Sequence, residues 1–118
     1  MDNDTTVLVE LMLNAEQLCA ILEKPREKVP SDRDAEELRL KLGQARNALA
    51  RLQSRFDRDE LRIGNKTVQA EFRLLLVTLL WAVFYCRQTI DRRAYRRLVS
   101  LQSGLIGSLT NDAGFGDW

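Results

Sequence analysis

A heptad pattern in the middle of the chain constrains the fold more than any other feature of the sequence. Apolar residues recur there at alternating intervals of three and four positions: Ala35, Leu38, Leu42, Ala45, Leu49, Leu52 and Phe56. This spacing places the seven side chains on one side of an α-helix and is typical of a coiled-coil seam. Ser31 is a good N-cap and Gly64 a good C-terminal stop, so the pattern predicts a helix over residues 32–63.

Two further helices are predicted on either side of this one. The first covers residues 5–24 and stops before Pro25, and its ionised residues up to position 23 are all acidic. The third covers residues 66–103, and its continuity is an open question. Only 6 Gly and 2 Pro occur in 118 residues, which excludes a β-sandwich or barrel. We therefore predict a single all-α domain over residues 1–109, followed by a tail of residues 110–118.

The helix lengths predict a three-helix, coiled-coil-like bundle with two long helices. Helices in globular domains average about 11–12 residues, and helices about three times that length would overhang the short first helix. Leaving five or six large aliphatic side chains in water would forgo on the order of 10 kcal/mol of stabilisation. We therefore expect oligomerisation or a partner chain to complete the bundle. The expected oligomer or partner seam consists of Leu38, Leu42, Leu49, Leu52, Phe56, Leu79 and Val83.

Two groups of cations are candidates for recognising a partner. The first group flanks the heptad seam: Arg39, Lys41, Arg46, Arg55 and Arg62. Parallel pairing with a second copy would bring these like charges together, so an acidic surface suits them better, and the first helix carries acidic residues. Simple exposure to solvent is the alternative.

The second group lies on the third helix, opposite an apolar side that includes Leu98. It consists of Arg92, Arg93, Arg96 and Arg97. Guanidinium groups bind carboxylates and phosphates equally well, so a protein partner, nucleic acid and mere solubility are the three alternatives. We expect protein carboxylates, because a net charge of +1 creates no long-range field that would gather a polyanion.

The C-terminal tail ends on two aromatic residues, Phe115 and Trp118, between glycines. Aromatic side chains on a short strand can fill pockets and often dominate an interface. We therefore predict a tail anchor that binds to the same bundle or to a neighbour, with an unstructured end as the alternative.

The sequence offers no motif for catalysis, for a cofactor or for a metal ion. Histidine is absent, which removes the commonest acid–base catalyst and metal ligand. Cys19 and Cys86 lie in apolar stretches, which favours reduced and unreactive thiols. We predict that the protein is not an enzyme and needs no cofactor.

A scaffold is the function that this combination favours. We predict a non-catalytic helical assembly subunit that mediates protein–protein interaction in a homo- or hetero-oligomer. The alternatives are a nucleic-acid-binding subunit that uses the arginine face, and a small dedicated chaperone or adaptor for a client helix.

The uncharged run from Leu74 to Cys86 is thirteen residues, and a membrane span needs about twenty, so no span is expected. The N-terminal residues lack the basic region of a signal peptide, so an intracellular location, cytoplasmic or nuclear, is expected.

Overall fold

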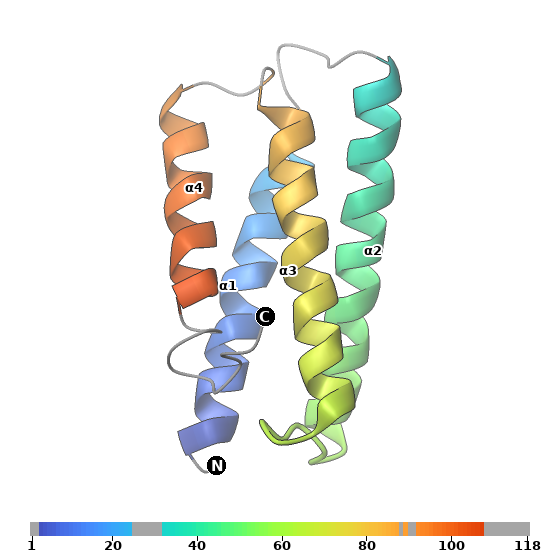
Figure 1. The fold of residues 1–118 in the computed structure, drawn as a ribbon, viewed down its shortest axis with the longest axis vertical. Helices are drawn as coiled ribbons and strands as arrows, with labels where there is room; N and C mark the ends of the chain where they lie inside the picture. The colour runs from blue at the N-terminus through green and yellow to red at the C-terminus, as the bar shows by residue number, and fades with distance from the viewer. Residues whose placement is uncertain (1–2, 25–31, 88, 90–91, 108–118) are drawn as a thin grey trace.

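The structure, a computed structural model, is a bundle of four α-helices (Figure 1). It describes residues 3–24, 32–87, 89 and 92–107, and within these residues no strand occurs. The helices are α1 (Asn3–Glu23), α2 (Asp32–Asp57), α3 (Lys66–Cys86) and α4 (Arg92–Gly107). The predicted all-α fold is therefore confirmed, with one more helix than expected.

The bundle is elongated, with extents of 43 × 23 × 23 Å, and its helices lie roughly along the long axis. Figure 1 shows α3 between α2 and α4, with α1 behind it. All four helices contribute fully buried side chains to one core, because each turns an apolar side inward. The largest of these side chains are Leu8, Leu11, Leu18 and Leu22 on α1, Leu52 on α2, Phe72, Leu75 and Leu79 on α3, Leu98 on α4, and Leu61 in the α2–α3 turn.

The second helix ends at Asp57, whereas the sequence pattern predicted that it would continue to residue 63. Asp59 adopts a left-handed backbone with φ of 57°. The N–H of Glu60 donates to the carbonyl of Arg55, and the N–H of Asp59 donates to that of Phe56. These two bonds form a Schellman stop, which glycine usually provides but aspartate also tolerates. The stop allows Leu61 to turn back into the core.

The third predicted helix, residues 66–103, is not continuous, because it divides into α3 and α4. Asn65 begins α3, and its side-chain oxygen accepts the N–H groups of Thr67 and Val68. At the other end Thr89 donates both its N–H and its hydroxyl to the carbonyl of Cys86. α3 thus ends at Cys86 without glycine or proline, and α4 folds back along the bundle.

This fold-back changes the outcome for the expected oligomer seam. Leu38, Leu49 and Leu52 of α2, with Leu79 and Val83 of α3, are buried in the core of the chain itself. The long helices do not overhang, because the chain shortens α2 and doubles back after α3. The two remaining seam residues, Leu42 and Phe56, are half-buried.

The prediction that no segment could span a membrane is wrong. Two helical segments, Thr5–Glu23 and Lys66–Cys86, are long and apolar enough to cross a bilayer. The expectation rested on an uncharged run alone, whereas a segment with one or two charged residues can still have a mean hydropathy high enough for a span, as Thr5–Glu23 does with Glu10 and Glu16 inside it. In this structure 44% of each of these segments is buried inside the bundle.

Candidate functional site

A clasp of three charged side chains joins α1 to α2. The guanidinium of Arg46 lies 2.5 Å from a carboxylate oxygen of Glu16 and 2.5 Å from one of Glu23. A second nitrogen of Arg46, Nε, donates to Glu23 at 2.9 Å. The hydrogen bond from Arg46 lowers the pKa of the Glu23 carboxyl below its ordinary value. For Arg46, the acidic surface expected from the sequence is therefore the first helix of the same chain.

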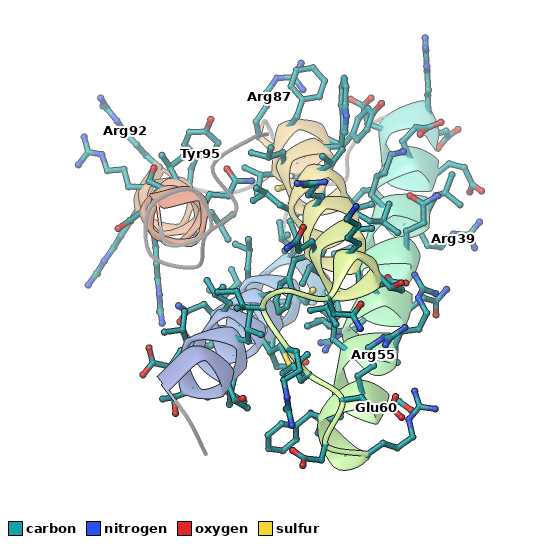
Figure 2. All side chains as sticks on the ribbon, turned by 60° about the horizontal axis from the view of Figure 1, so that its bottom comes forward. Arg39, Arg55, Glu60, Arg87, Arg92 and Tyr95 are labelled. Carbon is teal, nitrogen blue, oxygen red and sulfur yellow. The ribbon has the colours of Figure 1, made fainter. Side chains whose placement is uncertain are left out.

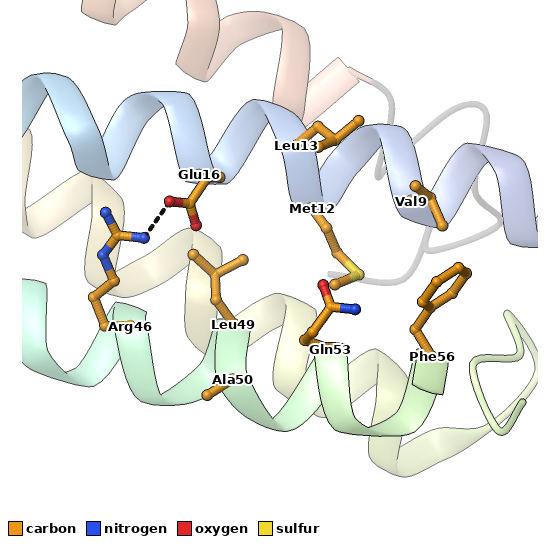
Figure 3. A pocket seen from close by; sticks show the side chains of 9 residues that line it. All are labelled: Val9, Met12, Leu13, Glu16, Arg46, Leu49, Ala50, Gln53 and Phe56. Atoms are coloured by element: carbon orange, nitrogen blue, oxygen red, sulfur yellow. Dashed lines mark hydrogen bonds and ion pairs between the residues drawn. The ribbon is translucent and has the colours of Figure 1, made fainter. Parts of the chain in front are cut away.

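Two hollows lie along the seam between α1 and α2, one on each side of this clasp. The first has a volume of about 470 Å³ and is lined by Val9, Met12, Leu13, Glu16, Arg46, Leu49, Ala50, Gln53 and Phe56 (Figure 3). The second has a volume of about 430 Å³ and is lined by Leu22, Glu23, Ala35, Leu38, Arg39, Leu42, Gly43 and Arg46. We name the two hollows together the α1/α2 groove. Its lining is mostly apolar, with the clasp as a polar crossing.

Part of the heptad pattern of α2 lines the groove. Leu42, Leu49 and Phe56 are seven residues apart, and all three line it. On α1 the opposite wall includes Leu13, whose side chain is 58% exposed and is therefore the most accessible of the large apolar residues described. A row of this spacing can receive the apolar side of another helix.

A second surface lies on the outer side of α3. Five large apolar side chains are 39–48% exposed there: Leu74, Val77, Leu80, Trp81 and Phe84. At 100° per residue they cover about 120° of the helix, opposite the side that buries Phe72 and Leu79. They therefore stand along the outermost line of the helix, and we name them the α3 ridge.

An aromatic cluster with a cation ends the α3 ridge. The Trp81 ring stacks on that of Tyr85 with centroids 5.9 Å apart and meets Phe84 edge-on at 5.7 Å. The guanidinium carbon of Arg87 lies 3.8 Å from the centre of the Phe84 ring. Its Nη1 also donates to the Phe84 carbonyl, so the arginine is held in place at the end of α3.

The four arginines of the predicted charged face, Arg92, Arg93, Arg96 and Arg97, are exposed on α4, while Leu98 is buried on its opposite side. The helix is attached to α3 by a hydrogen bond from the buried Gln102 side chain to the Leu79 carbonyl. Figure 2 shows Arg87, Arg92 and Tyr95 pointing to the same side of the molecule. The predicted tail anchor, Phe115 and Trp118, lies outside the described residues.

Both cysteines are buried, on α1 and α3 respectively. Burial raises the pKa of the Cys19 thiol to about 11. The Cys86 sulfur donates to the Val83 carbonyl at 3.3 Å. Thiols in such apolar surroundings are poor nucleophiles.

Sequence reasoning missed the hollowed α1/α2 groove and the α3 ridge. A feature of the sequence could have predicted the ridge, because residues 74–86 are uncharged on every side of the helix. A helix in such a bundle buries only part of its surface, so some of these apolar residues must be exposed. The described residues form a four-helix bundle with an apolar groove between α1 and α2 and an exposed apolar ridge on α3. Comparison of the chain with protein-family models, with curated proteins and with solved structures finds no match.

Proposed function

We propose that the protein is a non-catalytic helical assembly subunit that binds one helix of a partner protein in the α1/α2 groove. The observation that carries the proposal is the heptad row along the groove, in which Leu42 and Phe56 are half-buried and Leu49, between them, is almost fully buried at its floor. A partner helix with apolar residues at heptad spacing would meet this row over its whole length. The Arg46 clasp divides the groove, so a small or polar residue of the partner fits at that level.

A glycine in α2 supports this proposal. Gly43 lies inside the helix and lines the second hollow. Glycine in a helix interior is less stable than alanine by about 0.5–1 kcal/mol. A methyl group at this position would meet nothing within 4 Å, so the packing of the bundle does not require glycine. The proposed function supplies a reason for this glycine, because a partner helix could bring its backbone close to α2 at this position.

The experiment compares two exposed leucines. Leu13 is 58% exposed at the groove, whereas Leu40 is 52% exposed on α2 and does not line it. Tagged protein is purified from its native cell, its stoichiometric partner is identified by mass, and the binary affinity is measured with the purified partner. We expect Leu13→Asp to weaken binding at least about tenfold, because it places a charge against an apolar helix. We expect Leu40→Asp to bind as the unaltered protein does.

Two results contradict the proposal. One is the recovery of no stoichiometric partner from the native cell. The other is equal affinity of the Leu13→Asp and Leu40→Asp variants for the recovered partner, with helicity by circular dichroism unchanged in both.

A further inference from the structure

The exposed apolar and basic side chains of α3 and α4 form one continuous face that is separate from the α1/α2 groove. On α4, Tyr95 and Val99 are 37% and 38% exposed. At 100° per residue, Arg92 and Arg96 lie on the same flank of α4 as Tyr95 and Val99. Arg93 and Arg97 lie on the opposite flank. Figure 2 shows that Arg92, Tyr95 and Arg87 point to one side. The face therefore joins the α3 ridge to an apolar strip on α4 and three arginines.

The charges that α3 and α4 themselves contribute to this face are almost all of one sign. From residue 72 to residue 107 the sequence contains six arginines and one acidic residue, Asp91. The ion pairs among the described residues use acids of α1, of α2, of the α2–α3 turn and of the start of α3, and none of them involves an arginine of α4. Two copies of this face would bring arginines against arginines, so a second copy does not fit. An anionic surface would fit this face, because it would pair with the arginines.

The shape of the face distinguishes an anionic membrane from an acidic protein helix. The exposed side chains of α3 stand on its outermost line, so they form a ridge and not a groove. A partner helix gains most contact in a groove, whereas a fluid bilayer closes around a ridge. Trp and Tyr are enriched at the membrane interface, where rings lie at the level of the headgroups and arginines bind phosphates. On this face Trp81 stacks on the half-buried Tyr85, and Arg87 lies over the ring of Phe84, so aromatic rings and a guanidinium stand side by side.

We propose that the face formed by the α3 ridge, Tyr95, Val99 and Arg87, Arg92 and Arg96 binds the surface of an anionic membrane. The helices lie in the plane of the interface, and the ridge enters it while the core side of α3 stays packed in the bundle. The hydropathy of Lys66–Cys86, which suffices for a span, serves here for partial insertion of one helix side.

The test uses the full chain with phosphatidylcholine vesicles that either contain or lack phosphatidylserine. The chain has 2 tryptophans, and Trp118→Phe leaves Trp81 as the single reporter. We expect cosedimentation with the anionic vesicles, a blue shift of Trp81 emission, and little binding to neutral vesicles.

Two arginine pairs on one helix provide the matched comparison. Each arginine near an anionic surface changes affinity about fivefold, so Arg92→Gln with Arg96→Gln is expected to weaken binding about 25-fold. Arg93→Gln with Arg97→Gln, on the other flank, removes the same charge and is expected to have a much smaller effect. Val77→Gln is expected to weaken binding about tenfold, and the exposed control Leu40→Gln to leave it unchanged.

Failure to bind anionic vesicles overturns the proposal, as does equal binding to neutral vesicles. Equal loss from the two arginine pairs, with unchanged circular dichroism, also overturns it, because a general charge effect would then account for binding. None of these results bears on the α1/α2 groove, since these substitutions lie outside it.

Discussion

Replacing Leu52 by alanine tests whether the heptad seam of α2 is the internal core of this chain. Leu52 is 0% exposed and belongs to the single core to which all four helices contribute. Truncating a fully buried leucine removes its transfer free energy and leaves a cavity, and together these cost about 2–5 kcal/mol. Domain stabilities are about 5–15 kcal/mol, so the loss is a large part of the total.

The expected change is large in thermal unfolding as well. At about 2.1 cal/mol/K per residue, the unfolding entropy of a 118-residue chain is about 0.25 kcal/mol/K. A loss of about 3 kcal/mol therefore lowers the melting temperature by about 12 °C. Urea unfolding followed by circular dichroism at 222 nm measures the free energy directly.

A matched variant makes this result decisive. Leu13 has the same side chain on α1 but is 58% exposed, so Leu13→Ala is expected to change stability by less than about 0.5 kcal/mol. If Leu52→Ala costs no more than Leu13→Ala, Leu52 is not in the interior and the described packing of α2 is wrong.

Three further outcomes follow from the structure. Gly43→Ala is expected to raise the free energy of unfolding by about 0.5–1 kcal/mol and to weaken partner binding, and an unchanged affinity would argue against close approach at this position. Cys19 and Cys86 are expected to react with a thiol reagent only as the protein unfolds, since both are buried, and rapid reaction of the native protein would contradict this. The Arg46 clasp lowers the pKa of Glu23 below 4.5, so it contributes stability above that pH. We expect this contribution to be lost as the pH falls through the lowered pKa, and Arg46→Gln to reduce the pH dependence of urea unfolding.

The sequence predicted the helices where local signals were strong. The heptad spacing located α2, and the acidic residues of the first helix were the expected counterparts of Arg46, which the structure confirms. The two failures in the placement of helices concern helix ends, and the failure to foresee the two helices apolar enough for a membrane span is separate from them. The stop at Asp59 needs a left-handed backbone that aspartate seldom adopts, and α3 ends at Cys86 without the glycine or proline that would have signalled it in the sequence.

The candidate surfaces were harder to predict, because they depend on how α4 folds back. A continuous third helix would leave the seam exposed and would favour a partner at Leu52 or Leu79, which are in fact internal. Once α4 returns along α3, most of the large apolar residues left exposed belong to the α3 ridge, and the others include Leu13 at the rim of the groove. Periodicity identifies which residues share a helix side, but it does not say which neighbour covers that side.

The most direct test of the proposed function is site-specific photo-crosslinking in the native cell. A photoreactive residue replaces Leu13 in the α1/α2 groove, and in a second variant it replaces the similarly exposed Leu40 outside it. We expect an adduct from position 13 with one protein, mapped to a helix with apolar residues at heptad spacing, and none with that protein from position 40. An adduct from position 40 with none from position 13, or no protein adduct at either position, would contradict it.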